Sequence, residues 1–162
     1  GHARPVPMLA VLGNHEFECG KQDEIVRILS DGGVTVLDGT AVEILGVGFA
    51  GVKGFCGGFG ARALQPWGEA ALKQFARESV EETVKLESAL AKLRTPSKVV
   101  LMHYAPILDT VRGEPAEIFA FLGSSRYSTV ALTLALPPSR PSTATESSEF
   151  FCEPSPLSED IV

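Results

Sequence analysis

The sequence of 162 residues is poor in cysteine, tryptophan and histidine, with three, one and three of these residues respectively. The cysteines are Cys19, Cys56 and Cys152, and an odd, widely spaced set argues against a disulfide framework and favours a reducing compartment. No run of about 18 apolar residues occurs, which argues against a transmembrane helix, and residues 1–7 lack the apolar core of a signal peptide. We therefore expect a cytoplasmic protein without a membrane partner.

Basic charge is also scarce, because 14 Lys and Arg stand against 20 Asp and Glu and leave a net charge of −6. This acidic balance disfavours a nucleic-acid-binding surface. Hydrophobic residues make up 44% of the chain and charged residues 21%, which is close to the composition of globular domains and excludes disorder of the whole chain. The length corresponds to one domain, or to one domain with a tail.

Glycine is absent from residues 127–162, although the chain has 16 glycines in all. The same segment is acidic and rich in Ser, Thr and Pro, which is typical of disordered sequence. We therefore divide the chain into a domain at residues 1–126 and a tail at residues 127–162, in which only 129–136 has the pattern of a strand. Either a reading-frame shift or fusion near Arg126, or a genuine disordered extension, explains the change.

Apolar strands alternate with amphipathic helices in residues 1–126. Short apolar runs predict strands at residues 8–12, 34–37, 40–45, 47–52 and 98–102. Apolar stripes at helical spacing predict helices at residues 22–30, 68–93 and 114–122. The pair Asp38-Gly39 predicts a tight hairpin turn between the second and third strands. This mixture predicts an α/β fold with a mixed sheet.

Two histidines directly follow predicted buried strands, in Gly13-Asn14-His15-Glu16 and in His103-Tyr104-Ala105-Pro106. Ligands bind at the carboxyl ends of parallel strands in open α/β sheets, so we expect these two loops to meet at one edge. Taken alone, each motif is more often a hydrogen-bonded strand-end histidine or an ordinary Asn turn. Together they favour a metal site, since imidazole and amide oxygen are ligands for Zn, Fe or Mn.

These motifs resemble those of the calcineurin-like metallophosphoesterases. Residues 11–16 are similar to the family's Gly-Asn-His-Asp/Glu motif, and residues 99–106 are similar to its strand followed by His-x-x-Pro. The resemblance covers residues 8–126. It implies a two-layered β-sandwich flanked by helices and a site of two divalent metal ions, Mn, Fe or Zn, that hydrolyses phosphate esters through a metal-bound hydroxide.

The resemblance also implies roles for individual residues. Asn14 and His103 would ligate the same metal ion. His15 would instead face the substrate phosphate, where it would stabilise transition-state charge and protonate the leaving oxygen. Glu16 is expected either to position this loop or to be a solvated acid. The class of phosphate ester is left open.

Parts of the family pattern are missing from the sequence. The family's early Asp-x-His and Gly-Asp-x-x-Asp motifs and its late Gly-His-x-His motif do not occur, so Asn14 and His103 are the remaining candidate ligands. Catalytic metal sites usually have three or more protein ligands. We therefore expect an incomplete, inactive form of a phosphatase, with a fragment boundary at its N-terminus. The alternatives are a non-catalytic ligand- or partner-binding module on the same fold, and a site completed by a second chain.

The glycine-rich loop at residues 53–60 is expected either to cover the substrate site or to be a surface connection. Lys53 and Arg62 are candidate phosphate contacts, and Cys56 is expected to be a buried thiol. Residues 46–51 match Gly-x-Gly-x-x-Gly, but the glycine-rich sequence after them disfavours the helix that a dinucleotide site requires.

Overall fold

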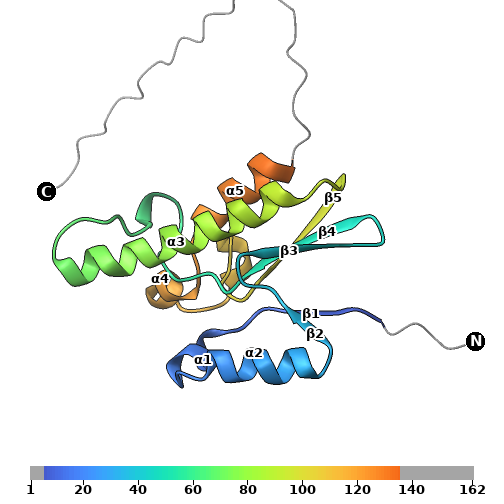
Figure 1. The fold of residues 1–162 in the computed structure, drawn as a ribbon. Helices are drawn as coiled ribbons and strands as arrows, with labels where there is room; N and C mark the ends of the chain where they lie inside the picture. Colours follow the sequence, from blue (N-terminus) through green and yellow to red (C-terminus); the bar gives the residue numbers. More distant parts are fainter. Residues whose placement is uncertain (1–5, 136–162) are drawn as a thin grey trace, which may run out of the picture.

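A computed structural model describes residues 6–135 of the chain, and it contains two small β-sheets (Figure 1). In the first sheet, β1 (Met8–Ala10) pairs in parallel with β2 (Val34–Val36). In the second, the strand order is β3 (Thr40–Ile44), β4 (Val47–Val52) and β5 (Ser97–Met102), antiparallel and then parallel. The prediction of an α/β fold with mixed strand pairing is confirmed.

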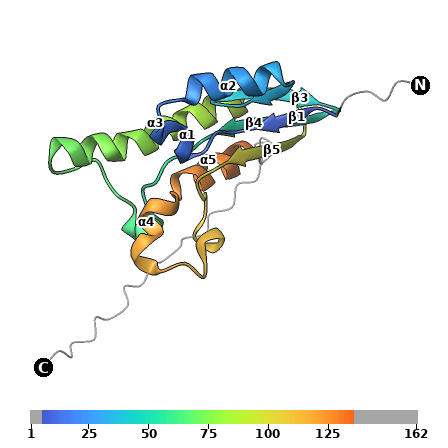
Figure 2. The same cartoon turned by 90° about the horizontal axis from the view of Figure 1, so that it is seen from below.

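Helices lie on the outer faces of both sheets. The longer helices are α2 (Gln22–Asp31), α3 (Ala70–Lys92) and α5 (Arg126–Ala135), and α1 (Asn14–Glu18) and α4 (Phe119–Leu122) are short. Figure 1 shows α2 beneath β1 and β2, whereas α3 and α5 lie beyond β3, β4 and β5. In the view from below, α4 and the chain between β5 and α4 lie on the side away from α2 (Figure 2). None of the helices within residues 6–135 combines the length and the apolar character needed to cross a membrane.

The hairpin lies one strand later than the sequence predicted. The strand β2 pairs with β1, while β3 pairs with β4 in a register that runs from Thr40 opposite Gly51 to Ile44 opposite Val47. The turn residues Leu45 and Gly46 have φ of 51° and 81°, as a type I′ turn requires. The predicted hairpin at Asp38-Gly39 is therefore wrong, because these residues carry the chain from one sheet to the other.

The two sheets pack closely where β4 carries a glycine. A Cβ atom on Gly51 would lie 2.6 Å from Cβ of Leu37 and 2.8 Å from Cγ1 of Val11, so only the absence of a side chain permits this approach. On its other side, the β3–β5 sheet packs against α3 and α5. The core cluster there consists of Ala50, Val52, Leu86, Ala89, Leu90, Leu93 and Tyr127.

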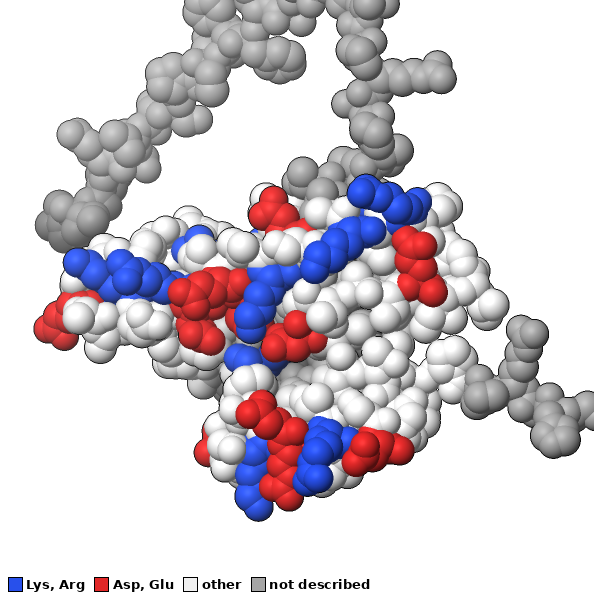
Figure 3. Space-filling model, viewed as in Figure 1, with Lys and Arg blue, Asp and Glu red and all other residues white. Residues whose placement is uncertain are grey.

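The buried face of α3 differs from the predicted apolar stripe. Leu72, Val80 and Val84 are exposed, although their spacing predicts that they lie on that stripe. Ser79 and Glu82 are buried instead, on the same face as Leu86. Charged side chains of both signs lie along the outer surfaces of α2 and α3 (Figure 3), as expected of helices that face water on one side.

The helix α5 lies across the boundary that composition suggested between residues 126 and 127. Tyr127 is fully buried, and Val130, three residues later, packs against the same core. The sequence predicted a strand at residues 129–136, but residues 129–135 belong to the helix α5, so that prediction is wrong for them. The helix places Tyr127 and Val130, which are three residues apart, against the same core. Residues 136–162, which include Cys152 and most of the predicted tail, lie outside the described residues, as does His2.

Candidate functional site

The structure brings Asn14 and His103 into direct contact. Asn14 is the first residue of α1, just after β1, and His103 follows β5. The Nε2 atom of His103 lies 2.8 Å from Oδ1 of Asn14, although the two residues are 89 positions apart in the chain. The two motifs therefore meet at one place, as the sequence predicted.

Gly13 makes this contact sterically possible. A Cβ atom at Gly13 would lie 2.9 Å from Cε1 and 3.1 Å from Nδ1 of the His103 ring. The backbone N–H of Gly13 also donates a hydrogen bond of 2.7 Å to Oε2 of Glu16. Glu16 thus holds the start of α1, which agrees with a positioning role rather than with a solvated acid.

Further hydrogen bonds orient the two side chains. The Nδ2 group of Asn14 donates to Oε1 of Glu18 at 2.8 Å, so its Oδ1 atom is the one that faces His103. The backbone N–H of His103 donates to the carbonyl of Lys53 at 3.2 Å, and the N–H of Tyr104 donates to the same oxygen at 3.1 Å. The Asn14 amide is therefore oriented by Glu18, and the backbone of His103 is held to the chain that follows β4.

His15 lies beside this pair in the chain but projects into solvent. Its side chain is 82% exposed, and Nδ1 lies 3.9 Å from Oε2 of Glu18. An exposed imidazole next to the pair is placed where a bound molecule can reach it. The contact between Asn14 and His103 does not involve the His15 ring.

The Asn14–His103 pair fits one part of a metal site. Two ligands on neighbouring corners of an octahedron, each about 2.1 Å from the cation, are about 3 Å apart, which matches the 2.8 Å between Nε2 and Oδ1. Within residues 6–135, however, no group of three His, Cys, Asp or Glu side chains could hold a metal ion. The described residues therefore bring together two atoms that could act as metal donors, Nε2 of His103 and Oδ1 of Asn14.

The glycine-rich loop adjoins this site and is largely buried. Lys53 at its start is only 7% exposed, and its Nζ lies 4.9 Å from the ring centres of Phe17 and Phe55 and 5.5 Å from that of Tyr104. Nζ also donates to the carbonyl of Gly54 at 2.9 Å. Arg62, the other candidate phosphate contact, is exposed in the short 3-10 turn Gly60–Arg62.

Two residues that the sequence did not single out hold this loop in place. The carboxylate of Glu82, on α3, accepts the Gly54 N–H at 2.9 Å. The hydroxyl of Tyr127, on α5, accepts the Phe55 N–H at 2.7 Å and donates to the Phe55 carbonyl at 3.3 Å. The spacing of Glu82 four residues before Leu86 was the available signal for a buried carboxylate.

Cys56 in the same loop is a buried thiol, as predicted. Burial raises the pKa of Cys56, which opposes formation of a thiolate, although a backbone hydrogen bond and the charge of Lys53 act in the other direction. The loop thus contributes a buried ammonium next to the Asn14–His103 pair, and not a reactive thiol.

Comparison of the chain with family models, curated proteins and solved structures gave no match.

Proposed function

We propose that the chain positions Asn14 and His103 to hold a divalent metal ion for the hydrolysis of phosphate esters. The observation that supports this most strongly is the contact of 2.8 Å between the two predicted ligands. An amide oxygen and an imidazole nitrogen together suit Mn, Fe or Zn. The activity itself is the one that the resemblance to calcineurin-like metallophosphoesterases implies.

Each residue near the site would have a distinct part in this chemistry. Asn14 and His103 would bind the cation, which, when bound, polarises a phosphoryl oxygen and provides hydroxide. Glu18 orients the Asn14 amide, and Gly13 leaves room for the His103 ring. The exposed His15 ring would hold a proton at one of its nitrogens for the leaving oxygen of the ester.

Two protein ligands are fewer than the three or more that catalytic cations usually have. We therefore propose that turnover requires donors beyond those in residues 6–135, from other segments or from a second chain. The Asn14–His103 pair alone should bind metal weakly. This sets the scale of the first experiment, which must use metal concentrations in the range of weak binding.

Metal binding is tested by calorimetric titration of the full chain with Mn²⁺ and with Zn²⁺. We expect binding that disappears in His103→Ala and in Asn14→Ala, because each change removes one donor. His15→Ala is the matched control, since it removes a neighbouring imidazole that is not expected to bind metal. Unchanged binding in both ligand variants would show that the ion is held elsewhere.

Catalysis is tested separately with p-nitrophenyl phosphate in the presence of Mn²⁺. If the chain turns over this ester, alone or after mixing with a second chain that supplies donors, His15→Ala should lower the rate by about 100-fold or more, as expected for loss of an acid catalyst. A rate that is unaffected by His15→Ala would exclude this role for His15.

The second candidate function is a non-catalytic ligand- or partner-binding module on the same fold. The observation that favours it is that Asn14 and His103 already satisfy each other by a direct hydrogen bond. The two functions differ in one measurable respect. A module would show no hydrolysis at any metal concentration or mixing ratio, while its folded structure would persist without metal.

A further inference from the structure

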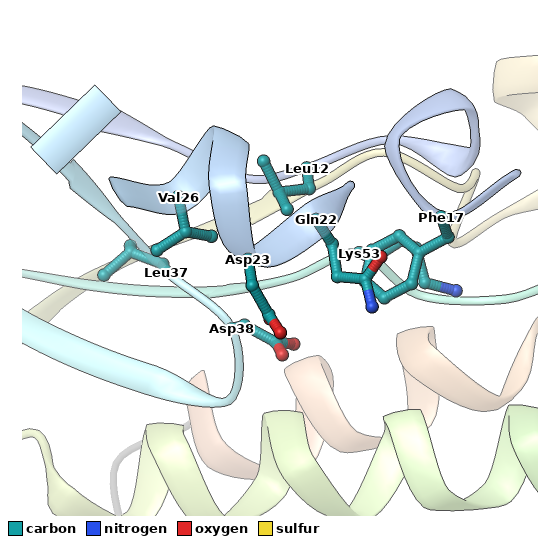
Figure 4. Close-up of a pocket in the computed structure, with 8 residues that line it drawn as sticks. All are labelled: Leu12, Phe17, Gln22, Asp23, Val26, Leu37, Asp38 and Lys53. Carbon is teal, nitrogen blue, oxygen red and sulfur yellow. The ribbon is translucent and has the colours of Figure 1, made fainter. Parts of the chain in front are cut away.

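A cavity of about 270 Å³ lies between α2 and the ends of β2 and β4, and it contains neither Asn14 nor His103 (Figure 4). Its wall is partly apolar, formed by Leu12, Val26 and Leu37. Polar side chains line the rest, among them Lys53, Gln22 and Asp23. The volume is just below the usual range of small-molecule pockets, and the combination of apolar walls with a few polar groups is typical of them.

Lys53 lines one end of this cavity, and its ammonium is buried there beside the Phe17 ring, with the Phe55 and Tyr104 rings on its other sides. Its ammonium group has three N–H donors, one of which is used by the carbonyl of Gly54. None of the ion pairs formed within residues 6–135 includes Lys53. The three aromatic rings stabilise the ammonium but do not neutralise its charge. Because buried lysines are normally paired with an anion, the cavity is suited to an anion that comes from outside the described chain.

Gln22 adds a second polar group at the same end. Its Oε1 atom is buried and has no hydrogen-bond partner among residues 6–135. Figure 4 shows the Gln22 side chain pointing toward Lys53 and the Phe17 ring. A buried acceptor without a donor is unfavourable, and a hydroxyl group of a bound molecule would satisfy it.

Two carboxylates face each other at the other end of the cavity, from Asp23 and Asp38 (Figure 4). The charge of Asp38 is partly balanced by Nζ of Lys85 at 3.5 Å. Ionised carboxylates accept hydrogen bonds from hydroxyl groups, and these two would repel a second anionic group. A matching ligand is therefore anionic at one end and hydroxylated at the other.

We propose that this cavity binds a small phosphorylated polyol or sugar, with the phosphate at Lys53 and the hydroxyls at Gln22, Asp23 and Asp38. The ammonium of Lys53 neutralises the phosphate, and Gln22 accepts a hydrogen bond from a hydroxyl next to it. This inference goes beyond the hydrolase function and does not depend on metal at Asn14 and His103. Binding is measurable whether or not the chain has any activity.

The test is calorimetric titration of the full chain, without metal, with glycerol 3-phosphate, inorganic phosphate and glycerol. We expect glycerol 3-phosphate to bind more tightly than phosphate, and glycerol not to bind. Lys53→Met should weaken glycerol 3-phosphate binding at least about tenfold through loss of a charge-assisted hydrogen bond, while Lys73→Met, an exposed lysine on α3, should not. Failure of the wild-type chain to bind either phosphate compound would overturn the proposal.

Asp23→Asn tests the hydroxyl end independently of the phosphate end. It should reduce the preference for glycerol 3-phosphate over inorganic phosphate, whereas the exposed Asp31→Asn at the end of α2 should leave that preference intact. Methyl chemical shifts of the wild-type chain locate the ligand even if Lys53→Met does not fold. Val26 and Leu37 should shift on titration and Val84 should not; shifts confined to other methyl groups would place binding elsewhere and refute this site.

Discussion

The two sheets differ sharply in how much apolar surface they bury. The region formed by β3, β4, β5, α3 and α5 contains the core cluster, in which Leu86 and Tyr127 are completely buried. The region formed by β1, β2 and α2 contributes Leu37, together with Leu12 beyond β1, and α2 itself has no buried residue. Local stability follows buried apolar contact, so we expect the first of these regions to hold the second in place.

The candidate site lies where these two regions meet. Asn14 belongs to the sparsely buried region and His103 to the densely buried one, and the distance between them depends on how the regions pack. The contacts that join the regions include Gly51 against Leu37 and Lys53 against Phe17. Ligand binding should therefore respond to small changes in the sparse region that barely affect overall stability.

Of the substitutions considered, we expect the largest loss of stability from one in the densely buried region. Leu86→Ala removes a completely buried side chain from the core between α3 and β4. We expect the free energy of unfolding to fall by about 3 kcal/mol, which is usual for Leu→Ala in a packed core. Urea unfolding followed by circular dichroism measures it. A loss below about 1 kcal/mol would mean that this region does not carry most of the stability.

Tyr127 gives the same region a dependence on alkaline pH. Burial raises the pKa of Tyr127 to about 12 from 10.0, with hydrogen bonds and nearby charges as smaller influences. Because the folded pKa is raised, the neutral hydroxyl stabilises the fold fully below pH 10, and this contribution is lost as the pH rises through about 12. At about 1.4 kcal/mol for each of the two pKa units, we expect a total loss of about 3 kcal/mol once the pH is well above 12.

Tyr127→Phe separates this titration from that of other groups. The variant should be less stable than wild type at neutral pH, since the Phe55 N–H and carbonyl lose their partner. The difference between the two proteins should then shrink between pH 10 and pH 12, as measured by urea unfolding at each pH. A constant difference over that range would rule out the titration of Tyr127 as its cause.

Local patterns in the sequence predicted elements well where glycine or aspartate interrupts an apolar run. The bounds of β4 agree with the prediction, because Gly46 before it and Gly54 shortly after it have positive φ. The position of the hairpin did not follow from local pattern. Asp38-Gly39 and Leu45-Gly46 both suit a turn, and the choice depends on the parallel pairing of β2 with β1, which joins distant parts of the chain.

Part of the candidate site was also predictable from local sequence pattern. Asn14 and His103 each follow a strand within a recognisable motif, so the amino-acid sequence alone is enough to expect their convergence. The setting of Lys53 could not be expected, because its three neighbouring rings come from α1, from the glycine-rich loop and from the residue after His103. The charged sequence around Glu82 predicts a solvated side chain, whereas its spacing from Leu86 places it on the buried face of α3. Its bond to the Gly54 N–H and its ion pair with Lys85 explain why a carboxylate is tolerated there.

Gly13→Ala tests the junction between the two regions, and its expected effect is a moderate loss of metal affinity. Gly13 has φ −100°, which alanine tolerates, but the new Cβ would lie within 3.1 Å of two atoms of the His103 ring. We expect metal affinity to fall about tenfold, or about 1.4 kcal/mol, because the ring must move away from Asn14. Calorimetry with Mn²⁺ measures this change. Gly32→Ala, at the end of α2, is the control and should leave the affinity unchanged.

The smallest expected effect is on the exposed face of α2. Ile28 is 57% exposed, so Ile28→Ala removes little buried surface and gains helix propensity. We expect the free energy of unfolding to change by less than about 0.5 kcal/mol, against about 3 kcal/mol for Leu86→Ala. A cost above about 1.5 kcal/mol would show that something covers this face in solution. Unfolding midpoints that rise with protein concentration would then identify that cover as a second copy of the chain, because association stabilises the folded state by mass action.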